Sequence, residues 1–115
     1  MKLVVIESPY ASATDEGVAR NLAYLDACMA DCFARNESPF ASHGLYTRKG
    51  VLDDRDPAQR RKGIEAGLDW ASLADVTVVY QDLGISDGMK QGIKHAESMG
   101  RPVVYRFLPG WEAAK

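Results

Sequence analysis

Two short runs of mainly apolar, β-branched residues constrain the fold of this chain more than any other feature. They are Lys2–Ile6 (KLVVI) and Val76–Tyr80 (VTVVY). Neither run alternates with polar residues, so each is typical of a strand that is buried on both faces. Such strands form parallel sheets that helices cover on both sides, because parallel neighbours need a crossover connection. The two runs therefore predict an α/β fold.

Helical patterns and short strands alternate along the rest of the chain. The expected elements are a loop at 8–14, a helix ending near Asn36, a strand at Ser38–Ala41, a long connection at Ser42–Arg55, a helix from Asp56 to about Leu73, a helix from Ser86 to Gly100 and a strand at Pro102–Arg106. Right-handed crossovers then predict a small doubly wound parallel sheet in the order 2-1-3-4, with helices on both faces. We expect residues 1–115 to form a single α/β domain.

Apolar residues spaced three or four apart mark the buried faces of the first two helices. The first stripe is Val18, Leu22, Leu25, Met29 and Cys32 or Phe33, and the second is Ile64, Leu68 and Ser72 or Leu73. Cys28 and Cys32 fall on one helix face, where we expect them to be small core side chains in a reducing compartment. His43 and His95 lack the spacing of paired metal ligands, so we expect no metal and no cofactor.

The composition excludes several classes of partner. The chain has 115 residues, 46% hydrophobic and 26% charged residues, and a net charge of −2. These values are ordinary for a globular protein and give no general attraction to nucleic acid or to an anionic membrane. The opening apolar run is too short for a secretion signal, so we expect a cytoplasmic protein.

Polar residues gather where three of the expected strands end. The candidate ligand-binding residues are Glu7, Ser8, Tyr10, Ser42, His43, Asp82, Ser86, Gly88 and Met89. Carboxyl ends of parallel strands share one edge, and a helix starting there directs free N–H groups toward an anion. Tyrosine can stack on a base or ribose, and carboxylates can accept from ribose hydroxyls. Together these residues suit a nucleotide. Taken singly, each also has an ordinary structural role: Ser86 as a helix cap, Asp82 as a turn former and Tyr10 as a loop anchor.

Two segments favour self-association. The connection at Ser42–Arg55 is long for so small a domain, and connections of this kind are usually functional or exchanged between subunits. The stretch Tyr105–Trp111 (YRFLPGW) is unusually aromatic, and exposed aromatic segments more often dock than remain free. We expect a homo-oligomer in which Arg48, Arg60 and Arg61 either form an ordinary solvated face or supply cations to phosphates across an interface.

Three short motifs carry a resemblance to a known family. Ser8-Pro-Tyr10, Ala74-Asp75 and Ser86-x-Gly88 resemble those of the nucleoside 2-deoxyribosyltransferases. The pattern is most similar to the 2′-deoxynucleoside 5′-monophosphate N-hydrolases, a fold that overlaps with the SLOG group of nucleotide binders. The chain also resembles small phage-encoded proteins of unassigned function, through Ser42–Thr47 and Asp82–Ser86.

Under this resemblance, two binding residues of the family have counterparts in this chain, whereas its two catalytic carboxylates do not. It implies that Tyr10 is the aromatic residue on the substrate side and that Ser86 contacts a 5′-phosphate. The family's nucleophilic glutamate follows that serine by six residues, where this chain has Gly92. The family's assisting aspartate precedes a tryptophan by three residues, where this chain has Gly67 before Trp70.

Three functions remain open from the sequence. The first is binding of a nucleotide-derived ligand, such as a nucleoside monophosphate or an ADP-ribose-type or cyclic signal, without turnover; for a phage protein, the resemblance implies sequestration of a host immune signal. The second is an N-glycosidase or deoxyribosyltransferase in which Glu7, Asp82 or Asp87 replaces the missing nucleophile. The third is a structural oligomerisation module.

Overall fold

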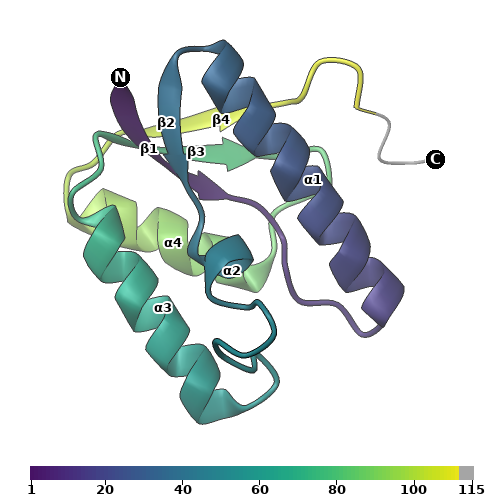
Figure 1. Ribbon diagram of the computed structural model, residues 1–115. Helices are drawn as coiled ribbons and strands as arrows, with labels where there is room; N and C mark the ends of the chain where they lie inside the picture. The colour runs from purple at the N-terminus through teal and green to yellow at the C-terminus, as the bar shows by residue number, and fades with distance from the viewer. Residues whose placement is uncertain (112–115) are drawn as a thin grey trace.

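The computed structural model describes residues 1–111 and contains a four-stranded sheet with helices packed on both faces (Figure 1). Its strands are β1 (Lys2–Glu7), β2 (Glu37–Phe40), β3 (Val76–Tyr80) and β4 (Val103–Arg106), arranged in the order β2-β1-β3-β4. Every neighbouring pair is parallel. The fold class and the strand order predicted from the sequence are confirmed.

Four helices connect or follow the strands, and side chains cap three of them. They are α1 (Asp15–Ala34), α2 (Ser42–Leu45), α3 (Pro57–Ala71) and α4 (Asp87–Ser98). Thr14, Asp56 and Ser86 accept hydrogen bonds from backbone N–H groups in the first turns of α1, α3 and α4. These bonds fix where each helix begins. Asn36, with φ of 60°, turns the chain from α1 into β2.

The alternating side chains of β1 and β3 build a core on each face of the sheet. Val4, Ile6, Val76, Val78 and Tyr80 join a buried cluster with α1, which contributes Tyr24, Leu25, Cys28 and Cys32. The other face packs against α4 through Met89, Gly92 and Ala96, all of them buried. The expected core role of both cysteines is confirmed, since each is buried and free.

Several predicted details need correction. The second strand lies one residue earlier than expected, and the connection after it contains the short helix α2. Phe33 is 58% exposed, so Cys32, the other residue expected at that place, completes the first stripe. Leu73 is 67% exposed and Ser72 is exposed as well, so neither extends the second stripe. Gly67 and Ala71 are instead the buried residues of α3. Helix α3 meets its neighbours through small residues, which an apolar periodicity does not reveal.

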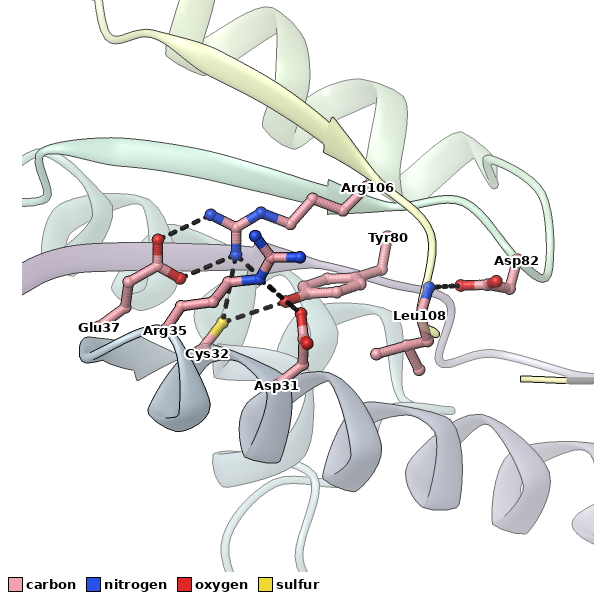
Figure 2. A network of polar contacts seen from close by, with 8 residues as sticks. All are labelled: Asp31, Cys32, Arg35, Glu37, Tyr80, Asp82, Arg106 and Leu108. Atoms are coloured by element: carbon pink, nitrogen blue, oxygen red, sulfur yellow. Dashed lines mark hydrogen bonds and ion pairs between the residues drawn. The ribbon is translucent and has the colours of Figure 1, made fainter. Parts of the chain in front are cut away.

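A polar network joins the two edge strands to the end of α1 (Figure 2). Arg106 on β4 donates two hydrogen bonds to Glu37 on β2, at 2.8 and 2.7 Å. The same guanidinium donates to the Tyr80 hydroxyl, which donates to Asp31 on α1. Arg35 completes the network through its ion pair with Asp31. The hydrogen bonds from Arg106 hold the pKa of Glu37 below its ordinary value.

The segment after β4 packs partly against its own chain. Leu108 is buried, and the Trp111 ring lies 5.0 Å from that of Tyr24. Tyr105 and Phe107 remain exposed. The aromatic tail predicted to dock on a neighbour therefore contributes two of its residues to the intramolecular packing against α1.

Candidate ligand-binding site

A pocket of about 380 Å³ opens where β1 and β2 end, between α3 and the first half of α4. We call it the β1–α4 pocket. Its polar lining residues are Glu7, Ser8, Tyr10, Ser42, His43, Tyr46, Thr47, Asp54, Gln59, Arg60, Ser86, Asp87 and Gln91. A volume of about 300–1,000 Å³ with a few polar groups on apolar walls is typical of small-molecule sites.

Glu7 ends β1 and places its carboxyl group against α4. A Cβ atom built on Gly92 would overlap this carboxyl group, so glycine makes the room that the side chain occupies. Burial raises the pKa of Glu7 to about 8, and the positive charge of Arg101 opposes that rise. At neutral pH the group is therefore mostly a neutral carboxylic acid.

Ser8 and His43 form a hydrogen-bonded pair in the same wall. The Ser8 Oγ atom lies 2.7 Å from His43 Nε2. Burial lowers the pKa of His43 to about 4, so the imidazole is neutral at physiological pH. A neutral imidazole has one donor and one acceptor nitrogen, and either arrangement can satisfy the serine hydroxyl. The pair joins the end of β1 to α2 without adding charge to the pocket.

The start of α4 and a side chain of α3 form an end of the pocket suited to an anion. Ser86 caps the helix by accepting from Met89 N, and the exposed Gly88 leaves its backbone open. A Cβ atom built on Gly88 would lie 3.9 Å from Arg60 Nη2. Asp54 holds the Arg60 guanidinium at 2.6 Å. A helix N-terminus and a guanidinium together favour a phosphate at this end.

Tyr10 lies on the loop between β1 and α1 and lines the pocket. Asn21 on α1 donates to the Tyr10 carbonyl oxygen at 2.8 Å, which anchors the loop backbone to the helix. The ring is half-buried rather than packed into the core. Its position is compatible with stacking on a ring of a bound ligand.

Asp82 and Asp87 have environments different from that of Glu7. Asp82 is absent from the pocket lining and accepts from the Tyr24 hydroxyl and from Leu108 N, at 2.6 and 2.9 Å. It connects β3 to α1 and to the segment after β4, so the expectation that it faces the ligand needs correction. Asp87 borders the pocket, but its side chain is 99% exposed. Of the three carboxylates considered as nucleophiles, Glu7 alone lines the pocket from a half-buried position.

Other side chains occupy the space beside Gly67 and Gly92. Glu7 fills the space beside Gly92, and Ser42 at the start of α2 fills the space beside Gly67. A longer side chain at position 67 would push α2 away from α3. The two glycines are therefore needed for the packing of this chain.

The sequence reasoning missed part of the site, chiefly Tyr46, Asp54, Gln59 and the placement of Arg60 in its own pocket. The sequence predicts Arg60 on a solvated face or across an interface, whereas it lies beside Gly88 of the same chain. Gly63 and Gly67 are four residues apart and line the pocket together with Arg60. That pair of glycines on one helix face was the available signal, because it indicates where other groups approach α3 closely.

Some groupings are absent from the described part of the chain. Among residues 1–111, no three His, Cys, Asp or Glu side chains gather closely enough to hold a metal ion. None of the helices described there has the length and apolar character needed to cross a bilayer.

Comparisons with known proteins agree with this architecture. A family model described as "Domain of unknown function (DUF7768)" matches residues 2–106. The fold is similar to that of a 2-deoxyribosyltransferase from Bacillus psychrosaccharolyticus, with a TM-score of 0.61 and 15% sequence identity over 96% of this chain and 75% of that one. The search of curated proteins finds no match. The structural likeness supports the predicted fold family.

Proposed function

Because residues 2–106 match that model, the chain belongs to the DUF7768 family, and we propose that it binds a nucleoside 5′-monophosphate or a related nucleotide in the β1–α4 pocket. The observation that carries this proposal is the anion-binding end of the pocket, where Arg60 lies beside the N-terminus of α4. The resemblance to a 2-deoxyribosyltransferase fold supports the nucleoside part of the ligand.

The dimensions of α4 support the same ligand class. Gly92 lies four residues beyond Gly88, which is about 6 Å along a helix axis. A phosphate at the start of α4 would therefore place an attached sugar close to Glu7. Tyr10 would then be available to the sugar or the base. The proposed ligand has its phosphate at Ser86 and Arg60 and its nucleoside toward the end of β1.

In this proposal, the protein binds the nucleotide and releases it without chemical change. Both positions at which the resembling enzymes carry catalytic carboxylates are glycine, at 67 and 92. Loss of a covalent nucleophile removes stabilisation of the transition state while contacts with the ligand persist. A pocket of this kind suits a receptor or a protein that sequesters a nucleotide signal. We further propose that the protein acts as a homo-oligomer, with Tyr105 and Phe107 as its exposed contact residues.

The first test is a thermal-shift screen against nucleosides, nucleoside monophosphates, ADP-ribose isomers and cyclic dinucleotides, followed by chromatography of each mixture. A monophosphate that binds should raise the melting temperature more than its nucleoside, because the phosphate contacts would be missing in the latter. Arg60→Gln should weaken binding about tenfold or more, since a charged hydrogen bond contributes about 1.5–3 kcal/mol. Arg61→Gln is the matched control, because Arg61 is exposed and lies outside the pocket lining.

The outcomes of the screen separate the candidate functions. A stabilising monophosphate recovered intact, with affinity lowered by Arg60→Gln alone, supports the proposal. If no nucleotide raises the melting temperature, the binding proposal fails and the oligomerisation module becomes the better account.

The Glu7 carboxyl group favours N-glycoside hydrolysis as a second candidate function. As a neutral acid, it can protonate the departing base, which keeps the electron pair of the broken C–N bond. Water then bonds to the anomeric carbon and returns a proton to the Glu7 carboxylate. This candidate predicts free base and sugar phosphate in the chromatogram, and it predicts that Glu7→Gln abolishes their release.

A further inference from the structure

Glu7 is a half-buried carboxyl group with no partner of its own. Among residues 1–111, no side chain or backbone group donates a hydrogen bond to its carboxyl oxygens, and none forms an ion pair with them. The carboxyl group nevertheless lines the β1–α4 pocket and rests on the backbone of α4 at Gly92. A half-buried polar group without a protein partner is costly unless something else satisfies it. The remaining open side is the pocket itself.

The charged and titratable groups that the structure describes around Glu7 are bonded to other partners and form no ion pair with its carboxyl group. The positive charge of Arg101 lowers the pKa of Glu7 from a distance. The guanidinium N–H groups of Arg101 instead contact the Thr77 hydroxyl and the His95 ring. His43 lines the pocket as a neutral ring, and Arg60 is bonded to Asp54. The neighbouring strand β3 presents Val79 beside Glu7. The end of the pocket near Glu7 is therefore poor in positive charge, in contrast to the anion-binding end.

We propose that Glu7 contacts the ligand as a neutral carboxylic acid that donates a hydrogen bond, so that the pocket selects a ligand with one anionic end and one uncharged end that carries acceptors. This inference rests on the proposed function and deepens it. A ring oxygen, ring nitrogen or carbonyl of a nucleoside supplies such an acceptor. A second phosphate on the sugar would bring two negative groups together whenever Glu7 ionises, and it would lack a cation to bind.

The ionisation of Glu7 agrees with this assignment. Burial raises the pKa of Glu7 to about 8, so the proton is in place before a ligand arrives. The accepting group of the ligand would raise that pKa further, because a hydrogen bond donated by the acid stabilises its protonated form. Ionising Glu7 would remove the hydrogen bond and place a negative charge beside the ligand. Binding is therefore coupled to retention of a proton.

Calorimetric titration across pH tests the coupling. The probes are the 2′-deoxynucleoside 5′-monophosphates of adenine and cytosine, whose bases keep their protonation state over this range, and one 3′,5′-bisphosphate, titrated from about pH 7 to about pH 10; the second phosphate ionisation, near pH 6, is then largely complete. The affinity of the monophosphates should fall by up to tenfold per pH unit above the pKa of Glu7. Glu7→Gln should bind with an affinity that does not depend on pH, because an amide N–H still donates. Glu65→Gln, on the exposed side of α3, should behave as the wild type.

The results separate this inference from the proposed function. Monophosphates that bind with the same affinity across this pH range would overturn the role of Glu7 and leave nucleotide binding standing. Equal affinity for the bisphosphate and the monophosphates would overturn the selectivity. No binding by any monophosphate would overturn the proposed function itself. Carbon NMR of the Glu7 carboxyl group in the wild type needs no variant, and an ionised group at pH 7 in the presence of a bound monophosphate would also contradict the inference.

Discussion

Glu7 and Gly92 depend on each other, and their pairing explains two oddities of the chain at once. A glycine in the middle of a helix is unfavourable relative to alanine by about 1 kcal/mol. Gly92 is nevertheless required, because the Glu7 carboxyl group occupies the space that a Cβ atom would take. Strand β1 carries the carboxyl group, and the glycine on α4 leaves the space that this group occupies. This packing relation is missed when position 92 is considered only as a place without a carboxylate.

Gly92→Ala should therefore destabilise the protein by about 1–3 kcal/mol, the range for overpacking of a buried site. Gly88→Ala on the same helix is the matched control, since its Cβ atom meets only ordinary contacts; it should retain or gain stability. Urea unfolding measures both. In the double variant Glu7→Ala with Gly92→Ala, the cost of the Gly92 change should largely disappear. Additive costs would mean that the two residues do not share this space.

The proton on Glu7 should also appear in the pH dependence of stability. Its pKa rises from 4.5 to about 8 on folding, so its stabilising contribution is complete below pH 4.5 and is lost as the pH rises toward 8. The loss is on the order of 3 kcal/mol after allowance for the opening to the pocket. Unfolding free energies at several pH values should fall over this window in the wild type and stay flatter in Glu7→Gln. Parallel curves would show that folding leaves the ionisation of Glu7 unchanged.

At the scale of elements, the ion pair between β2 and β4 is a connection that the apolar pattern of the sequence does not show. The side chains of Arg106 and Glu37 are each 12% exposed and make two hydrogen bonds to each other. Arg106→Gln should cost about 3 kcal/mol, because the carboxylate would remain buried without its cation. Arg35→Gln, on the exposed rim of the same network, should cost less than about 1 kcal/mol. Equal losses in thermal unfolding would contradict this ranking.

The ion pair between Arg106 and Glu37 should also affect how the stability of the protein falls at low pH. The pKa of Glu37 is lowered on folding, so the ion pair stabilises the protein above the ordinary value of 4.5 and is lost as the pH falls below it. The wild type should therefore lose stability more steeply on acidification than Arg106→Gln does. A steeper loss in the variant would place the acid-sensitive groups elsewhere.

The sequence predicted elements well where local chemistry defined them. The strands Lys2–Ile6 and Val76–Tyr80 follow from unbroken apolar runs, and Asp56 and Ser86 mark helix starts because their side chains cap free N–H groups. Helix α2 was missed, since Ser42–Leu45 contains no cap and no periodicity that four residues could display. On α3, the predicted Ile64 and Leu68 are half-buried, and the fully buried positions were missed because they are Gly67 and Ala71 rather than large apolar side chains.

At the scale of the whole molecule, strand order explains which site residues could be predicted. Glu7, Ser8 and Ser86 follow strands or begin a helix at one sheet edge, so topology alone brings them together. Tyr46 reaches the pocket through the fold of residues 41–56, which packs against α3, and Arg60 reaches it from the first turns of α3 itself. Asp82 also follows a strand, but its hydrogen bonds to Tyr24 and to Leu108 direct it to the α1 side. A position at the sheet edge therefore brings some residues to this site, but it neither guarantees a place there nor is required for one.

Self-association stays a prediction at the same scale. Tyr105 on the edge strand β4 and Phe107 just after it are 49% and 64% exposed. Exposed aromatic residues of this kind are enriched at interfaces, so light scattering should give a mass above that of one chain. Replacing both residues with serine should reduce that mass, whereas replacing the exposed Lys94 with serine should not. A monomeric mass for the wild type would contradict the prediction.

The measurement that tests the central claim most directly is an amide NMR titration of the labelled protein with a 2′-deoxynucleoside 5′-monophosphate. The β1–α4 pocket predicts the largest shifts at Ser8, Gly88 and Met89, with smaller shifts along the start of α3. Shifts confined to another part of the molecule, or none at millimolar nucleotide, would contradict nucleotide binding in this pocket.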